Sequence, residues 1–293
     1  MLDRYLLRYF LAVVDQGNFS RAAVHCNVSQ PTLSVGVAKL ERLLGHALFV
    51  RSNQRVELTD AGSRLLAHAR RIEREFNLAQ QAMEPASALP SLRLGALSSI
   101  PAGPIAAAIA GVRPQETYRF ELVFGSEREL ASQLAKGRID LALTLVDRGA
   151  ERFLERRILN EGYVLAMPRK HALAGMEAID GEQLVGEVMI VRRHCEALSD
   201  VSRHFTERGV RPHFSLRSTN DERVLEMVAA GLGITVMPES YVHQGVAKPR
   251  LSGFSDRRTV GWMAGHHAEH LLAGPGDLIA AIEAQLHRTH ELA

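Results

Sequence analysis

Small polar side chains gather near residue 30, in a pattern that could contact the edges of DNA bases. They are Ser29, Gln30, Pro31, Thr32 and Ser34. Gln can pair with adenine through both side-chain groups, and a Thr methyl packs on the methyl of thymine. Ser also caps helices and Pro starts them, so capping alone would explain part of this pattern. We expect all five residues to contact bases or phosphates.

Two arginines could add phosphate or minor-groove contacts next to that segment. Arg51 and Arg55 flank a polar stretch between two short apolar runs, residues 47–51 and 56–58, which predict a two-stranded wing. An exposed Arg is often only solvated, but at a hairpin tip beside a DNA-reading helix its guanidinium suits a phosphate. We therefore assign both arginines to DNA binding.

Short helices must position these residues. Apolar side chains recur at helical spacing over residues 6–14 and 33–44, and Ser20 is a plausible cap for a helix between them, residues 21–26. Gly45 suits the turn that ends the third helix. Two short helices joined by a tight turn and followed by a wing predict a winged helix-turn-helix.

A longer helix is predicted from about Asp60 to Met83, capped by Thr59. Its apolar residues step by four and three, which is the spacing of a coiled-coil seam. A lone helix of this length has no core of its own in which to bury the seam, so we expect it to pair with a second copy. The dimerisation residues of the seam are Leu65, Ala69, Ile72 and Phe76.

Beyond a proline-containing linker, residues 85–90, strands and helices alternate. This alternation predicts an α/β domain of open, mostly parallel sheets with helices on both faces. We expect strands near residues 92–97, 119–124, 140–145, 163–167, 188–191, 214–217 and 234–237, and helices near 103–110, 127–135, 221–230 and 278–287.

Hydroxyl, imidazole and thiol groups follow several of these strands. Open α/β sheets bind ligands at the carboxyl ends of their strands, and a helix N-terminus there favours a carboxylate. Capping is the commonest use of Ser and Thr, so that alternative stays open for each residue. We expect Ser99 and Thr219 to lie on facing walls of one crevice. The candidate effector-binding residues are Ser98, Ser99, Ser126, Thr144, His194, Cys195 and Thr219.

Cys195 invites a redox hypothesis, because it follows Arg192, Arg193 and His194 at the end of a predicted strand. Neighbouring positive charge lowers a thiol pKa and favours the reactive thiolate. The chain has no second cysteine after Cys195, and Cys26 belongs to a different predicted domain, where we expect it to fill the core. We therefore favour Cys195 as a small residue that lines the ligand crevice.

Metal and enzyme hypotheses find little support in the residue pattern. His266, His267, Glu269 and His270 cluster, but Glu269 does not directly follow the first histidine, as a zinc protease motif requires. Gly231-Leu-Gly-Ile lacks the third glycine of a dinucleotide fingerprint, and neither a Walker A loop nor a Gly-x-Ser-x-Gly elbow occurs. We expect no metal, no cofactor and no catalytic residues.

Composition limits the remaining classes. A chain of 293 residues predicts two domains, or three if one is small, and its two cysteines exclude a disulfide scaffold. Apolar runs are too short to span a membrane, and the first residues do not form a signal peptide. We expect a soluble cytoplasmic protein. The net charge is +2, with +3 in residues 1–86, an asymmetry too mild to establish DNA binding by itself.

Several motifs together resemble the LysR-type transcriptional regulators. The likeness is dense over residues 5–67 and departs at Cys26 and Gly36, where the family usually has larger apolar residues. Gly36 weakens its helix by roughly 1 kcal/mol relative to Ala and could alter which bases are read. The motifs include Gly17-Asn-Phe-Ser-Arg-Ala-Ala, Val28-Ser-Gln-Pro-Thr-Leu-Ser, Val56-Glu-Leu-Thr, Leu134-Ala-Lys-Gly-Arg-Ile-Asp-Leu-Ala-Leu and Ala230-Gly-Leu-Gly-Ile-Thr-Val-Met-Pro.

The resemblance implies an architecture and partners. It implies a winged helix-turn-helix at residues 1–59, a dimerising linker helix and hinge at 60–87, and an effector domain at 88–293 that resembles periplasmic binding proteins. We place its first subdomain at about 91–161 with 258–293, and its second at about 162–257. It also implies a homotetramer, a dimer of dimers, on an interrupted palindromic operator of double-stranded DNA, a small organic and anionic effector, and RNA polymerase as a partner.

Two alternatives stay open. A cysteine-based redox-sensing regulator would use Cys195, which resembles the reactive cysteine of the family's peroxide-sensing branch. A solute-binding protein without a DNA role would explain the alternation of strands and helices in the second domain, but not the helix-turn-helix. Retention on heparin or DNA at low salt, with release by salt, would separate the regulator from the solute-binding protein.

Overall fold

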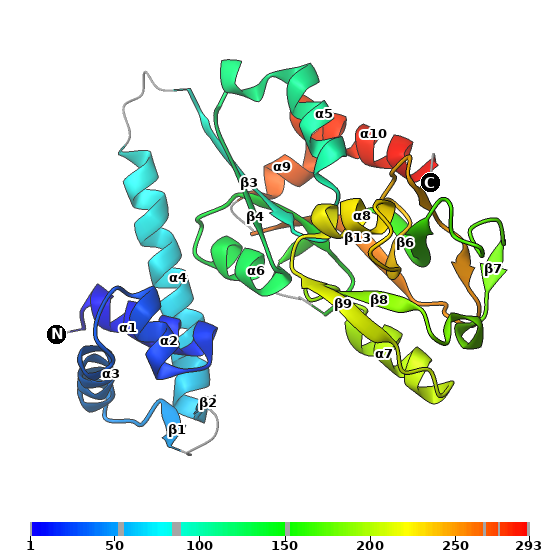
Figure 1. The fold of residues 1–293 in the computed structure, drawn as a ribbon. Coiled ribbons are helices and arrows are strands. Elements are labelled where there is room, and N and C mark those ends of the chain that lie inside the picture. The colour runs from blue at the N-terminus through cyan, green and yellow to red at the C-terminus, as the bar shows by residue number, and fades with distance from the viewer. Residues whose placement is uncertain are drawn as a thin grey trace. The chain divides into compact units, whose positions relative to one another are not determined.

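The computed structural model describes residues 2–51, 56–83, 89–149, 153–265, 268–274 and 276–291. These residues form two compact units (Figure 1). One unit comprises Met1–Ala88 with Ala131–Ile139, and the other Leu89–Leu130 with Asp140–Ala293. Each unit is described by itself below.

The N-terminal unit is a helix-turn-helix followed by a small wing and a long helix. Its core forms where the apolar faces of the three short helices meet, around Leu6, Phe10, Leu33 and Leu40, each with no exposed surface. The elements are α1 (Arg4–Gln16), α2 (Phe19–His25), α3 (Gln30–Leu44), β1 (Phe49–Arg51), β2 (Val56–Leu58) and α4 (Asp60–Ala82), with β1 and β2 antiparallel.

Side-chain caps start these helices, and one of them differs from our expectation. Ser29 caps α3 and Thr59 caps α4, as predicted: their hydroxyls accept the N–H groups of Thr32 and Gly62. Ser20 does not cap α2. Asn18 does so instead, because α2 already begins at Phe19 and Ser20 lies inside its first turn. One carboxamide oxygen of Asn18 accepts two backbone N–H groups, at 2.8 and 3.1 Å.

The apolar seam of α4 is partly buried within its own chain, contrary to our expectation. Ala69 has no exposed surface, and Leu65 and Ile72 pack against the core of the helix-turn-helix. The reason is that α1 lies along α4 and covers this part of the seam. Farther along, Phe76 is 45% exposed, with the guanidinium of Arg4 4.5 Å from its ring centre. The structure does not show a coiled coil.

The second unit contains mixed sheets flanked by helices. Strands β3, β4 and β5 are parallel, as the alternation of elements predicts, and α5 packs against α10. The order of the main sheet is β4-β3-β5-β13-β6-β12-β7, where β13 is Arg257–Ala264, β6 Leu154–Pro168, β12 Arg250–Leu251 and β7 Ala178–Ile179. β10 (Thr235–Pro238) and β11 (Val246–Ala247) also pair with β6. The first elements are β3 (Ser91–Leu97), α5 (Ala102–Val112), η1 (Pro114–Glu116), β4 (Arg119–Gly125), α6 (Glu127–Ala135) and β5 (Leu141–Leu145).

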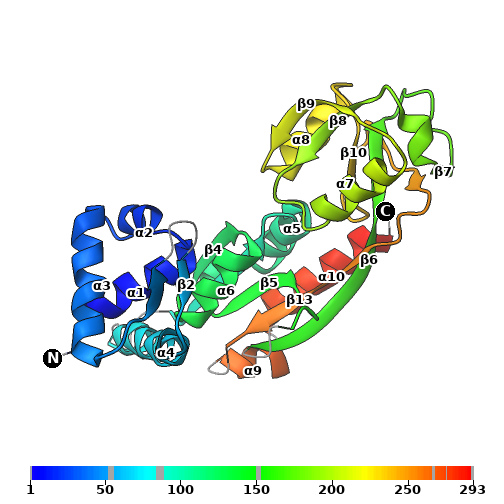
Figure 2. The same ribbon diagram turned by 90° about the horizontal axis from the view of Figure 1, so that it is seen from below.

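Two long antiparallel strands depart from the mostly parallel sheets that we expected. β6 (Leu154–Pro168) and β13 (Arg257–Ala264) pair with each other, and β13 also pairs antiparallel with β5. β6 continues into the second subdomain, where β10 (Thr235–Pro238) runs antiparallel to it (Figure 2). β6 and β13 are the two segments on which the chain crosses from one subdomain to the other. An alternation of strands and helices does not predict such crossings.

Residues 163–251, which we assigned to the second subdomain, contain buried apolar clusters of their own beside a two-stranded parallel sheet. This sheet joins β8 (Val188–Arg192) to β9 (His213–Ser218), with α7 (Leu198–Glu207) and α8 (Asp221–Ala229) beside it (Figure 1). We did not expect α7. The remaining elements are β7 (Ala178–Ile179), η2 (Gly181–Leu184), β11 (Val246–Ala247), β12 (Arg250–Leu251), α9 (Glu269–Ala273) and α10 (Asp277–Glu291).

Candidate functional site

The start of α3 presents its polar side chains at the surface. Ser29, Gln30, Pro31 and Thr32 are exposed, and Ser34 is half-buried. The Ser29 and Thr32 hydroxyls lie 2.7 Å apart, and the Gln30 amide donates to the Ser34 hydroxyl at 2.9 Å. These side chains are held by one another, so they form a small preordered polar surface whose remaining donors and acceptors face solvent.

Two further residues of α3 are exposed near this surface. Val35 is 64% exposed and Lys39 is exposed, and both follow Thr32 at helical spacing. The Lys39 ammonium donates to the Tyr5 hydroxyl at 2.9 Å, and this hydrogen bond raises the pKa of Lys39. The sequence indicates this surface at Val35, an apolar residue that lies outside the buried stripe of α3.

Gly36 faces the interior and not the DNA-reading side, which corrects our expectation that it could alter base recognition. A Cβ at this position would lie 2.5 Å from the Tyr9 ring of α1. The glycine therefore lets α1 and α3 approach closely. Cys26 is half-buried against the same core, and burial raises the pKa of its thiol.

The wing is described only in part. Arg51 ends β1, and its pairing with Val56 fixes the backbone of the hairpin. The tip of the wing, including Arg55, lies outside the described residues.

A crevice cavity of about 270 Å³ lies between the two subdomains. Ser98 enters it after β3, and Thr219 enters it from the segment between β9 and α8. The structure therefore brings together two of the residues that we selected, one from each subdomain. The full lining is Ser98, Ile100, Ala102, Phe124, Thr219, Asn220, Asp221, Glu222 and Tyr241.

A carboxylate from the second subdomain reaches the start of α5 across this crevice. The N-cap of α5 is Pro101, which makes no side-chain capping hydrogen bond. Glu222 supplies the acceptor instead: its Oε1 accepts the backbone N–H of Ala102 at 3.1 Å. A helix N-terminus carries positive partial charge, so the arrangement shows that this end of α5 accommodates a carboxylate.

Ser99 does not face Thr219, which corrects our expectation. Its side chain is buried, and both its hydroxyl and its carbonyl oxygen accept the guanidinium of Arg258, at 3.1 and 2.9 Å. Arg258 is the centre of a buried ion cluster with Glu161 and Glu196, whose carboxylates lie 2.8 and 2.6 Å from it. Burial opposes ionisation of Glu196, but Arg258 prevails and lowers the pKa of Glu196 to about 2.

Three other selected residues lie outside the lining of the crevice cavity. Ser126 donates to Glu129 at 2.8 Å, and His194 is exposed. Thr144 is buried on β5, and its hydroxyl has no hydrogen-bond partner among the described residues. The Ser126 hydroxyl also accepts the backbone N–H of Glu129, so this side chain is held at the first turn of α6.

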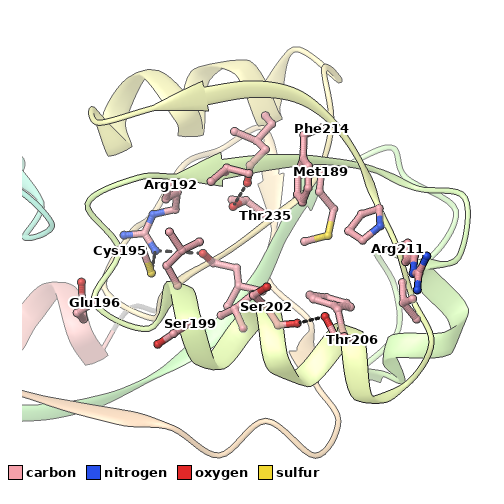
Figure 3. Close-up of a pocket in the computed structure, with 18 residues that line it drawn as sticks. Met189, Arg192, Cys195, Glu196, Ser199, Ser202, Thr206, Arg211, Phe214 and Thr235 are labelled. Carbon is pink, nitrogen blue, oxygen red and sulfur yellow. Dashed lines mark hydrogen bonds between the residues drawn. The ribbon is translucent and has the colours of Figure 1, made fainter. Parts of the chain in front are cut away.

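Cys195 lines a different cavity, of about 820 Å³, between α7 and the β8–β9 sheet (Figure 3). The Arg192 guanidinium donates to its sulfur at 3.4 Å. Arg192 is itself buried and paired with Asp221, from Nε to Oδ1 at 2.9 Å. Burial raises the pKa of the Cys195 thiol, and the positive charge of Arg192 only partly offsets this. The thiol is therefore not the strongly acidic group that the basic neighbours in the sequence suggested.

The described residues contain neither a cluster of metal ligands nor a membrane-spanning helix. Among the described residues, no three His, Cys, Asp or Glu side chains gather as metal ligands would. His266 and His267 lie outside the described residues, while Glu269 and His270 belong to α9. No described helix is both long enough and apolar enough to cross a bilayer.

Comparisons with known proteins identify both parts of the chain. A family model described as a bacterial regulatory helix-turn-helix protein of the lysR family matches residues 5–63, and one described as the LysR substrate binding domain matches residues 86–273. The DNA-binding transcriptional dual regulator OxyR of Escherichia coli K12 is 31% identical over 238 residues, which are 79% of this chain and 77% of that protein.

Two more relatives extend over most of the chain. The hydrogen peroxide-inducible genes activator of Haemophilus influenzae is 32% identical over 253 residues, which are 83% of this chain and 82% of that protein. A solved structure of a full-length OxyR variant from Pseudomonas aeruginosa is 25% identical, covers 98% of both chains and has a TM-score of 0.54.

Proposed function

Because this chain belongs to the LysR family and is a DNA-binding transcriptional regulator, we propose that it reads DNA through α3 and its wing and senses a small carboxylate in the crevice cavity. The DNA contacts would come from the polar start of α3, with Val35 and Lys39 on the same exposed face. Arg51 and Arg55 would contact phosphates beside them.

The observation that carries the effector proposal is the Glu222 carboxylate at the start of α5. An effector carboxylate would displace Glu222 and take over the Ala102 N–H, with the Ser98 and Thr219 hydroxyls on opposite sides of it. Displacement would change the contact between the subdomains. A ligand shifts a protein between two conformations only if it binds one of them more tightly. Here the ligand would bind more tightly to the conformation in which Glu222 has left the Ala102 N–H.

Calorimetric titration of the full-length protein with a panel of small mono- and dicarboxylates tests this proposal. Glu222→Gln should increase affinity for the carboxylate that binds, because a competing charge is removed, whereas Thr219→Val should decrease it. Glu226→Gln, on the same exposed side of α8, is the matched control. Equal affinity in all four proteins would place the effector elsewhere.

Assembly completes the proposal. We infer a dimer of dimers bound to an interrupted palindromic operator, with RNA polymerase as the partner at the promoter. Exposed Phe76 near the end of α4 supports a role for this helix in pairing. Closure of the crevice would then alter the spacing of the DNA-binding units.

Peroxide sensing through Cys195 is the second candidate. The names of the relatives favour it, and so does the Arg192 N–H that points at the Cys195 sulfur. Burial raises the pKa of the thiol, and the chain's other cysteine lies in the other unit, so we rank this candidate second. A peroxide-dependent change in the operator footprint that disappears in Cys195→Ser would establish it in place of the carboxylate effector.

A further inference from the structure

The cavity of about 820 Å³ between α7 and the β8–β9 sheet lies inside the second subdomain and is three times larger than the crevice cavity. Its volume is within the range of small-molecule sites in proteins. The cavity is open to the surface on one side, so part of its lining, including Leu198 and Phe214, is exposed and free to contact a ligand.

One wall of this cavity is apolar. Figure 3 shows Met189 and Phe214 projecting from the sheet toward α7. Phe214 is 39% exposed although it lines the cavity, so part of its ring has no protein neighbour. On the side of the sheet, the apolar lining residues are Met189, Ile190, Val191, Phe214 and Val236.

α7 lines the cavity with the apolar side chains of Leu198, Val201 and Phe205, and it also carries hydroxyl groups there. Ser199, Ser202 and Thr206 are spaced by three and four residues, so they share one face of the helix, and all three line the cavity. The Thr206 hydroxyl donates to the Ser202 carbonyl oxygen at 2.8 Å. An apolar wall opposite a few polar groups is the usual lining of a ligand pocket.

The two ends of the cavity differ in charge. At one end, Arg192 is committed to Asp221 and to the carbonyl oxygen of Val236. At the other end lies Arg211, which is exposed and pairs with no carboxylate among the described residues (Figure 3). A guanidinium without an ion-pair partner at the mouth of an apolar cavity suits a carboxylate head group.

We propose that this cavity binds an amphipathic carboxylate, with its alkyl or aryl body between α7 and the β8–β9 sheet and its carboxylate on Arg211. The proposal concerns a second ligand site and is independent of the crevice. Apolar burial would supply affinity, and Arg211 would select the charged head over a neutral one.

Calorimetry of the full-length protein with octanoate and with 1-octanol tests the proposal, because the two probes share a tail and differ in charge. The parent protein should bind both. Arg211→Gln should weaken octanoate by roughly tenfold, the value of one charge-assisted hydrogen bond, and leave octanol within about twofold. Arg169→Gln, an exposed arginine of the same subdomain, should match the parent.

A cavity-filling variant localises the binding. Ser202→Trp should abolish binding of both probes while the protein keeps its oligomeric state in sedimentation. Failure of the parent to bind octanoate, or binding of both probes by Ser202→Trp with the affinity of the parent, would overturn the proposal. So would a changed oligomeric state in Ser202→Trp, because a second copy would then cover this surface. Arg211→Gln changes only a surface side chain, and equal octanoate affinity in it and the parent would also refute the assignment.

Discussion

At the scale of single residues, the contacts of charged side chains with residues far away in the chain are the features that the sequence did not reveal. Arg258 contacts Ser99, which is 159 positions away in the chain, and Glu222 contacts Ala102, which is 120 positions away. The spacing of residues in a sequence indicates which side chains share a face of one helix or strand. It does not indicate contacts between distant segments, so neither pair was predictable. Ser98 and Thr219, by contrast, could be selected, because both follow predicted strands.

We expect Arg258→Met to lower the free energy of unfolding by about 3–5 kcal/mol at pH 7, because it leaves the buried carboxylates of Glu161 and Glu196 without their cation. In the folded parent, the pKa of Glu196 is lowered to about 2. Its stabilisation is therefore complete above the ordinary carboxyl pKa, near 4.3, and is lost as the pH falls toward 2.

The difference in the free energy of unfolding between Arg258→Met and the parent should therefore shrink as the pH falls from the ordinary carboxyl pKa toward 2. Denaturant unfolding from pH 7 to pH 2.5 measures it. Arg257→Met, at an exposed neighbour, should stay within about 0.5 kcal/mol of the parent. A deficit that does not change with pH would contradict the role of the carboxylates.

At the DNA surface, we expect Gln30→Ala to reduce specific affinity by about 1–3 kcal/mol and to relax the preference at one base pair. Arg55→Ala should instead weaken binding to all sequences alike and flatten the dependence on salt. Binding titrations on operator and random DNA at several salt concentrations separate the two effects. Equal losses on both DNAs for Gln30→Ala would exclude base reading.

At the scale of elements, local patterns predicted the helix-turn-helix well, whereas long-range pairing escaped them. β6 begins with the charged stretch Leu154-Glu-Arg-Arg, which does not alternate as a half-buried strand does, and its partner β13 lies about 100 residues away. α7 was missed although Leu198, Val201 and Phe205 recur at helical spacing, because this stripe has only three apolar members over ten residues.

The contact between α1 and α3 leads to a prediction about packing. Gly36→Ala should lower the free energy of unfolding of the N-terminal unit by about 1–3 kcal/mol, although Ala favours helices, because its Cβ would clash with the Tyr9 ring. The loss should shrink in a Tyr9→Leu background. Thermal unfolding of the single and double variants measures this coupling. Stabilisation by Gly36→Ala alone would show that the two helices do not approach so closely.

The exposed end of the α4 seam leads to a prediction about assembly. Phe76→Glu should dissociate the oligomer without unfolding the chain, because Phe76 is 45% exposed while Ala69 and Ile72 support the core. Sedimentation together with circular dichroism measures both properties. Gln80→Glu, at an exposed position of the same helix, is the control. A Phe76→Glu protein that sediments like the parent would show that dimerisation uses another surface.

At the scale of the whole molecule, we propose that the crevice cavity controls DNA binding. The most direct measurement is quantitative footprinting of the full-length protein on an operator recovered by genome-wide mapping of its bound sites. Glu222→Ala frees the start of α5 from the opposing subdomain, so it should shift the boundaries of the protected DNA with no added ligand, while Glu226→Ala should reproduce the parent footprint. Identical footprints for Glu222→Ala and the parent at equal occupancy would contradict the account.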